Sequence, residues 1–303
     1  MDDAASASLL DALDGILDGE RYAPVLDWTA FGLGSLAKDR GIFAAPPDTD
    51  GELPYLDHSI DVVVVDEPAH VDEARRVATS AVVLAEPDQA GGVQVTRIER
   101  IAGDRGTSAE VALLELAGDA PLAVDAVETE IVAIAEPGVL PLPGCLEIAA
   151  GTLERDETAA AVAVKLLDAD GLLEGAGFAV FADGSAEGVG AGSAEVAAPW
   201  HDFVRPVCAG AGLLVVRAAA LRESGDGAAS LIDLSGRLRA KGRGLLYQPD
   251  AWAVRVRPDE SPDRTAGEAW SGILAARPER PDTLDDSVWR WLLVHDAPEE
   301  AWR

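Results

Sequence analysis

Histidine and cysteine, the side chains that most often bind transition metals, are scarce and scattered in this sequence. The histidines are His58, His70, His201 and His295, and the cysteines are Cys145 and Cys208. No two of them have the short spacing of a metal motif such as His-x-x-x-His. We therefore expect surface or capping roles for the histidines and buried, reduced thiols for the cysteines.

Carboxylates, by contrast, are abundant. The 303 residues include 54 Asp and Glu against 24 Lys and Arg, which gives a formal net charge of −30 and a pI near 4.3. Nucleic acids and anionic membranes are bound by clustered basic residues, so this balance argues against both as partners. Because 48% of the residues are hydrophobic, the chain can still bury a substantial core.

Lysine is rare among the basic residues, with only Lys38, Lys165 and Lys241. Abundant Asp and small apolar residues accompany this scarcity, a composition typical of proteins that work in concentrated salt. At molar salt the Debye length falls to roughly 3 Å, which screens the self-repulsion of such a charge. The sequence therefore indicates a halophilic protein, and an ordinary acidic protein is the alternative.

The beginning of the chain, Met-Asp-Asp-Ala-Ala, lacks the basic and apolar regions of a signal peptide. No stretch approaches the roughly 18 apolar residues that a membrane-spanning helix needs. We expect no transmembrane segment and a cytoplasmic location.

Predicted strands and helices alternate along the chain. Residues 59–65 (SIDVVVV) and 130–135 (EIVAIA) are apolar runs of the kind found in buried parallel strands. Helices are predicted over 69–78 and 232–241, the latter closed by Gly242. This alternation is typical of an α/β fold with a doubly wound sheet.

Six short blocks between residues 130 and 257 follow one another in a recognisable order. They are Glu130–Gly138, Leu142–Glu147, Val162–Gly171, Val207–Leu221, Ile232–Gly242 and Tyr247–Pro249. Their order and spacing, rather than any single block, resemble the second half of a family 2 glycosyltransferase of the GT-A fold, in the rhamnosyltransferase-like branch. The resemblance implies a Rossmann-like mixed sheet flanked by helices.

The resemblance also implies a site for a nucleoside-diphosphate sugar. The family holds a divalent cation, Mg²⁺ or Mn²⁺, on an Asp-x-Asp motif, and the cation stabilises the departing diphosphate. Glu136 falls at the first acid of that motif, whereas Gly138 falls at the second. Glu136 is therefore the expected contact to both nucleotide sugar and metal, with one carboxylate where two are usual.

A carboxylate base at the start of a later helix is the next implied residue, because it takes the proton from the acceptor hydroxyl. The family's Glu-Asp pair aligns with Ser230 and Leu231, and Asp233 is the acid that remains. Asp233 is thus the catalytic candidate, although a capping or orienting role suits its position better. Shifting the alignment by one or two residues would instead offer Asp226.

Acceptors approach the family's site near the loop before the block that begins at Val207. His201 and Asp202 lie in that loop, and Gly210 follows it. We expect these three residues on the acceptor side, although Gly210 also suits close packing of strands.

The first part of the chain allows two interpretations. In one, residues 60–66, 81–86 and 93–98 are the first strands of the transferase sheet. Asp66 and Glu67 would then lie where the uracil or ribose of the nucleotide sugar is bound.

In the other interpretation, residues 24–86 faintly resemble a Rossmann-type methyltransferase. The resemblance rests on Val25–Trp28 with Gly32 and Gly34, and on Leu53–Val63. A working methyltransferase also needs an acid on the following strand to bind ribose, and the sequence shows no such strand. Methyl transfer is therefore not expected.

Together these patterns predict an N-terminal α/β segment over 1–86, a glycosyltransferase-like core over 87–257 and a C-terminal helical appendage over 258–303. The appendage carries Trp289 and Trp291, which suit either packing or a protein partner. The function indicated is sugar transfer from a nucleotide sugar to a glycan or lipid-linked acceptor, or a degenerate form of it. The alternative is a non-catalytic pseudoglycosyltransferase that binds a partner in a surface-glycan pathway.

Overall fold

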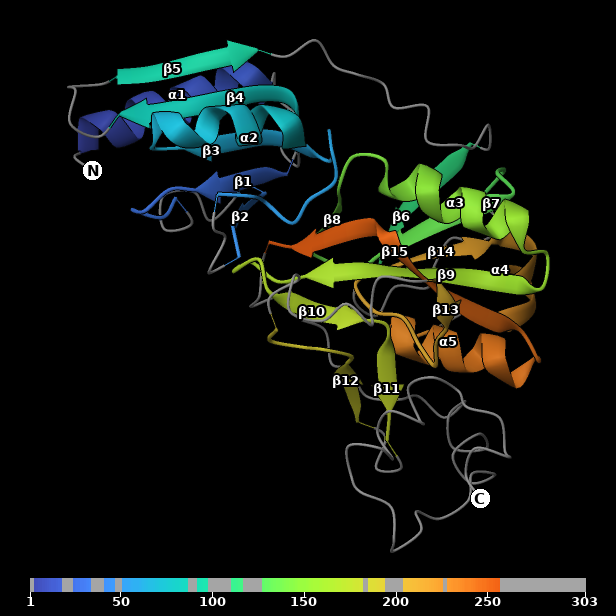
Figure 1. The fold of residues 1–303 in the computed structure, drawn as a ribbon. Coiled ribbons are helices and arrows are strands. Elements are labelled where there is room, and N and C mark those ends of the chain that lie inside the picture. Colours follow the sequence, from blue (N-terminus) through green and yellow to red (C-terminus); the bar gives the residue numbers. More distant parts are fainter. Residues whose placement is uncertain are drawn as a thin grey trace, which may run out of the picture.

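The computed structural model describes residues 3–17, 24–33, 41–46, 51–86, 92–97, 110–116, 127–181, 185–193, 204–225 and 228–256. Within these residues two large β-sheets, each with its own helices, share one hydrophobic core (Figure 1). The mixed α/β class predicted from the sequence is confirmed.

The first sheet contains five described strands in the order β2-β1-β3-β4-β5. The first four run parallel, and β5 is antiparallel to β4. β3 is buried along its whole length, as its run of valines predicts for a central parallel strand. The elements of this unit are α1 (Asp3–Leu17), β1 (Val25–Trp28), β2 (Ile42–Ala44), β3 (Ile60–Val65), the 3₁₀ turn η1 (Pro68–His70), α2 (Val71–Val77), β4 (Ala78–Glu86) and β5 (Gly92–Arg97).

Helices cover both faces of the first sheet. α1 places Leu9 and Leu13 on one face, in a cluster with alternate valines of β3. α2 places Ala74 and Val77 on the opposite face, in a cluster with Val63. Because each fully buried valine or leucine contributes about 1.5–3 kcal/mol, these two faces hold the parallel strands together.

The second sheet has the described strand order β13-β15-β9-β14-β7-β6, with β10 beside β9 and β8 beside β15. β9 and β15 are parallel, whereas β14 is antiparallel to both β9 and β7. The carboxyl ends of β7, β9 and β15 therefore meet at one edge. The strands are β6 (Val111–Glu115), β7 (Ile131–Ala135), β8 (Val139–Pro141), β9 (Ala159–Leu167), β10 (Leu173–Ala176), β13 (Arg205–Pro206), β14 (Leu213–Arg217) and β15 (Gly244–Arg255).

Three helices and a small hairpin accompany the second sheet. They are α3 (Cys145–Arg155), α4 (Ala218–Ser224), α5 (Leu231–Ala240) and the hairpin of β11 (Phe178–Val180) with β12 (Ala186–Gly188). α3 packs in one core cluster, with Cys145 and Leu153 buried there. α5 contributes Leu234 and Leu238 to the core shared with the first sheet. Both cysteines are buried and free, as predicted, and burial raises the pKa of the Cys145 thiol.

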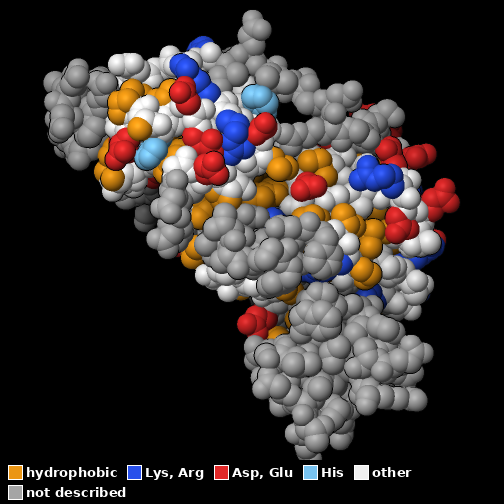
Figure 2. Space-filling model, viewed as in Figure 1, with side chains coloured by type: hydrophobic (Ala, Val, Ile, Leu, Met, Phe, Trp, Pro, Cys, Tyr) orange, Lys and Arg blue, Asp and Glu red, His pale blue; other side chains and the backbone are white. Residues whose placement is uncertain are grey.

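The two sheets meet where the end of β2 touches the turn after β9. The amide of Ala44 donates to the carbonyl of Ala169, over 2.9 Å. Gly171 has φ +73°, and a Cβ there would overlap the carbonyl oxygen of Ala44. The rings of Tyr55 and Trp252 lie 5.3 Å apart at the same junction. Apolar side chains run between the two units on the face drawn in Figure 2.

The first sheet continues past residue 86, because the free edge of β4 pairs with β5. Residues 244–255 form a single strand, β15, whose register against β9 shifts between Gln248 and Trp252. The expected appendage over 258–303, with Trp289 and Trp291, lies outside the described residues, as do His201, Asp202 and Asp226. Among the helices described, none has the length and apolarity needed to traverse a bilayer.

Candidate ion cluster at the edge of the second sheet

The edge where β7, β9 and β15 end brings together residues that are far apart in the sequence. Glu136 directly follows β7, and Arg255 is the last residue of β15. Glu174 lies on β10, which begins opposite Leu167 at the end of β9. Parallel strands place their carboxyl-end residues at a common edge, which is where ligands of open α/β sheets bind. This edge is therefore the candidate functional site.

Arg255 joins two carboxylates at this edge. Its Nη2 donates to Glu136 Oε2 over 2.7 Å, and its Nε lies 3.0 Å from both oxygens of Glu174. Glu136 is 1% exposed and Arg255 is 2% exposed, so little water screens their attraction. Glu136 Oε1 is buried and has no hydrogen-bond partner. The cluster thus holds two carboxylates around one guanidinium.

A divalent cation does not fit this arrangement well. The carboxylate that a metal would use is already bound to an internal cation, the guanidinium of Arg255. Gly138, at the position of the second acid, has φ +72° and no side chain to offer. The described residues contain no group of three or more His, Cys, Asp or Glu side chains that could hold a metal ion.

Asp233 is bound within the first turn of its own helix. The N-cap Ser230 accepts a hydrogen bond from the amide of Asp233, over 3.1 Å. The carboxylate of Asp233 in turn accepts from the amide of Ala229 and, over 2.9 Å, from Nε of Arg237. This arrangement is similar to a capping box, except that Asp233 binds the amide of Ala229, the residue before the N-cap, rather than that of Ser230 itself. Among the described contacts, Asp233 and Glu136 share no partner.

Gly210 lies between β14 and α5 in a close-packed position. Its amide donates to Ser235 Oγ over 3.1 Å. A Cβ at Gly210 would lie 2.8 Å from a methyl of Leu214 and 2.9 Å from the Cβ of Ala163. The space that glycine leaves here is filled by these neighbours. The other two residues expected on the acceptor side, His201 and Asp202, lie outside the described part of the chain.

Asp66 and Glu67 lie at the carboxyl edge of the first sheet, directly after β3. Asp66 Oδ2 accepts the amide of Ala30, over 2.7 Å. Asp27, near the end of β1, is 5% exposed and accepts from Thr29 Oγ1 over 2.6 Å. Burial raises the pKa of Asp27, against the lowering effect of its hydrogen bonds. The nucleotide-binding role expected for Asp66 and Glu67 stays a prediction.

Sequence reasoning missed two buried cations in addition to Arg255. Lys165 is 2% exposed and its Nζ lies 4.4 Å from the ring centroid of Trp252. Arg205 is 4% exposed, and its guanidinium stands 4.8 Å from the ring centroid of Tyr247. Burial lowers the pKa of Arg205. The sequence pattern that could have indicated buried cations is a single basic residue within an apolar run, as in AVAVKLL around Lys165 and AWAVRV around Arg255.

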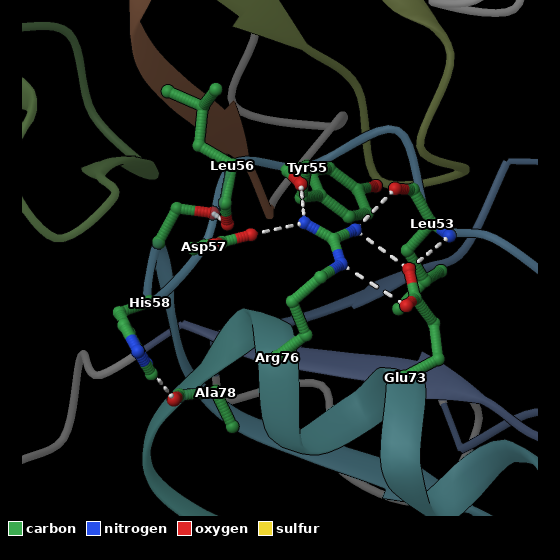
Figure 3. A network of polar contacts seen from close by, with 9 residues as sticks. Leu53, Tyr55, Leu56, Asp57, His58, Glu73, Arg76 and Ala78 are labelled. Atoms are coloured by element: carbon green, nitrogen blue, oxygen red, sulfur yellow. Dashed lines mark hydrogen bonds and ion pairs between the residues drawn. The ribbon is translucent and has the colours of Figure 1, made fainter.

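A hydrogen-bond network anchored on α2 holds the loop that supplies Tyr55 (Figure 3). The guanidinium of Arg76 donates to the carbonyls of Leu53 and Tyr55, over 2.9 and 2.8 Å. It also pairs with Asp57 at 2.7 Å and Glu73 at 2.6 Å. These contacts fix Tyr55 against Trp252, and Trp252 in turn supports Lys165.

The sequence matches no protein-family model, and a search of curated proteins gives no significant match.

Proposed function

We propose that this protein is a pseudoglycosyltransferase: a GT-A-like protein that serves a surface-glycan pathway by binding rather than by transferring sugar. The observation that carries the proposal is the ion pair between Arg255 and Glu136. The resemblance implies a metal at Glu136, and a guanidinium holds that carboxylate instead.

The arrangement of the six sequence blocks supports the GT-A resemblance. The block that ends at Gly138 forms β7 and the turn after it, and the block Val162–Gly171 forms most of β9 and its turn. Leu142–Glu147 leads into α3, which begins after Gly144 at φ +81°. The last blocks form β14, α4, α5 and part of β15. The strand-forming blocks therefore all contribute to one sheet.

The chemistry of the site argues against sugar transfer. A departing diphosphate is stabilised by a cation that contacts it directly. The guanidinium of Arg255 is enclosed and already engaged by Glu136 and Glu174, so it stabilises the fold rather than a leaving group. The base position is occupied by Ser230 and Leu231, and Asp233 is held by the helix start. Neither function of the transferase site is therefore supplied by these residues.

A turnover assay tests this proposal. The protein is incubated in molar KCl with UDP-, GDP- or dTDP-sugars and Mn²⁺ or Mg²⁺, and release of the nucleoside diphosphate is measured. We expect no release above that of protein-free buffer, and no change on substituting Glu136→Gln. Metal-dependent release that Glu136→Gln abolishes would overturn the proposal.

A further inference from the structure

Arg205 is a buried cation without the counter-ions that Arg255 has. It is 4% exposed and belongs to β13, the short strand that pairs with β15 at the edge of the described second sheet. Arg255, which is also buried, binds the carboxylates of Glu136 and Glu174. Among the described residues, no carboxylate forms an ion pair with Arg205. The charge of Arg205 is therefore not neutralised by the described part of the protein.

Most of the hydrogen-bonding capacity of this guanidinium is unused. An arginine side chain carries five N–H donors and no acceptor. Nη2 of Arg205 donates to the carbonyl of Ala176 over 2.7 Å. Nε and Nη1 are buried and have no hydrogen-bond partner. The guanidinium also lies over the ring of Tyr247, 4.8 Å from the ring centroid, and a ring face accepts no strong hydrogen bond. An acceptor is therefore missing at two guanidinium nitrogens.

The missing acceptor should carry negative charge. Burial lowers the pKa of Arg205, and the groups that oppose this effect are Tyr247 and Cys208, neither of them a carboxylate. Arginine nevertheless keeps its proton in proteins, so the charge remains. A cation that is enclosed without a partner is costly, and an anion bound beside it removes much of that cost.

We propose that a chloride ion binds at Arg205 and accepts a hydrogen bond from Nε or Nη1. One enclosed positive charge matches a monovalent anion, whereas a divalent phosphate or sulfate would leave negative charge uncompensated in the interior. The ligand must also be small, because Ala176 and Tyr247, which contact the guanidinium, are both 0% exposed.

The composition of the chain gives a second reason for chloride. A net charge of −30 repels anions at low ionic strength, but in molar salt the Debye length of roughly 3 Å confines this repulsion to short range. A site of only millimolar affinity is almost fully occupied at molar chloride, and it stabilises the folded state in proportion to the logarithm of the chloride concentration. The chloride site therefore suits a protein of halophilic composition, and it does not rest on the pseudoglycosyltransferase proposal.

Thermal unfolding at a constant molar potassium concentration tests the site. Potassium chloride replaces potassium gluconate, whose bulky anion cannot enter an enclosed space, in successive steps. We expect the melting temperature of the parent protein to rise by at least about 3 °C, linearly with the logarithm of the chloride concentration. Bromide, which has the same charge and a similar size, should act in the same way.

One variant locates the binding, and a second is the matched control. Arg205→Met keeps an unbranched apolar side chain and removes the charge, whereas Arg243→Met breaks an exposed pair with Glu223. The chloride effect, defined as the difference in melting temperature between the two salts, should be lost in Arg205→Met and retained in Arg243→Met. General effects of the salts act on all three proteins, so this comparison separates them from binding.

A direct measurement on the parent protein covers the case in which Arg205→Met does not fold. In gluconate buffer with dilute chloride, the parent should broaden the ³⁵Cl NMR line, and excess bromide should sharpen it again by displacement. Absence of this broadening, a melting temperature that does not depend on chloride, or a chloride effect that persists in Arg205→Met would overturn the inference. A larger Arg205-dependent effect of sulfate than of chloride would also overturn it. None of these outcomes bears on metal or transfer at Glu136.

Discussion

Arg255 shows how one residue can decide what a site is able to do. It is the buried last residue of β15, after the apolar run Ala251–Val254, and removing a guanidinium from water is costly unless carboxylates surround it. Glu136 and Glu174 meet that need. Because Arg255 binds the carboxylate of Glu136, that carboxylate is not available to a metal ion. In the proposed pseudoglycosyltransferase, the stability of this edge and the absence of metal-dependent transfer therefore have one physical origin.

Arg255→Met should destabilise the protein strongly. The substitution leaves two carboxylates without their cation in the interior, which costs about 3–5 kcal/mol in the free energy of unfolding. Urea unfolding monitored by circular dichroism in molar KCl measures the difference. Arg243→Met is the control, because Arg243 and Glu223 form an exposed pair worth about 1 kcal/mol or less. Equal losses in the two variants would contradict the account of the cluster.

The sequence predicted the position of Glu136 but not its partner. Residues 130–138 show an apolar run followed directly by an acid, so the place of Glu136 after a strand can be predicted from local sequence. Arg255 lies 119 residues further on, and only the pairing of β15 with β9 and β8 brings it back to this edge. The order of strands within a sheet depends on long-range packing, so local pattern does not show it. The capping role of Asp233 was easier to predict, since the spacing Ser-x-x-Asp is itself a local signal for the start of a helix.

At the scale of elements, the loop 51–59 depends on α2. The Arg76 network binds loop carbonyls that a strand or helix would otherwise satisfy (Figure 3). The hydrogen bonds that Glu73 accepts from Arg76 lower the pKa of Glu73. A carboxyl group whose pKa is lower in the folded than in the unfolded state stabilises the fold above the unfolded value. That contribution is lost as the pH falls through the folded value.

Glu73→Gln should therefore destabilise the protein at neutral pH and not in acid. We expect a loss of about 1 kcal/mol at pH 7, since the pair is partly screened by solvent. The difference from the parent should shrink as the pH falls below 4.5, the ordinary pKa of a glutamate, and through the lower pKa of Glu73 in the folded protein. Urea unfolding across this pH range measures it, with Glu223→Gln as an exposed control. A difference that stays constant down to acid pH would show that Glu73 acts through packing alone.

Elements with strong local patterns were predicted well. Residues 59–65 and 130–135 form β3 and β7, and the helix predicted over 232–241 is α5, one residue earlier. The assignment of strands to sheets was the weaker step. Residues 93–98 fell within the glycosyltransferase-like core expected over 87–257, whereas β5 pairs with β4 of the first sheet. Pairing depends on which edges remain free once the cores have formed.

For the whole molecule, the junction between the sheets is the feature on which their relative position depends. The turn after β9 passes so close to the end of β2 that residue 171 must be glycine. Tyr55 and Trp252 close the same junction from the shared core. Both carboxyl edges are thereby held as parts of one body.

Gly171→Ala should loosen this junction. The added methyl group meets the Ala44 carbonyl in a left-handed backbone conformation, so we expect a loss of at least about 3 kcal/mol in unfolding free energy. Gly51→Ala is the matched control: its φ is +82° and nothing lies within 4 Å, so backbone strain alone costs about 1–2 kcal/mol. Thermal and urea unfolding compare the two. Similar losses would show that the close approach at Gly171 contributes little.

The most direct test of the account is whether a divalent cation can replace Arg255. Melting temperatures are measured in molar KCl, with and without MnCl₂, for the parent, Arg255→Ala and Arg237→Ala. Removing the guanidinium frees Glu136 and Glu174 for a metal, so Mn²⁺ should raise the melting temperature of Arg255→Ala by several degrees and leave the other two unchanged. A parent protein that Mn²⁺ stabilises as much as Arg255→Ala would contradict the claim that arginine has taken the place of the metal.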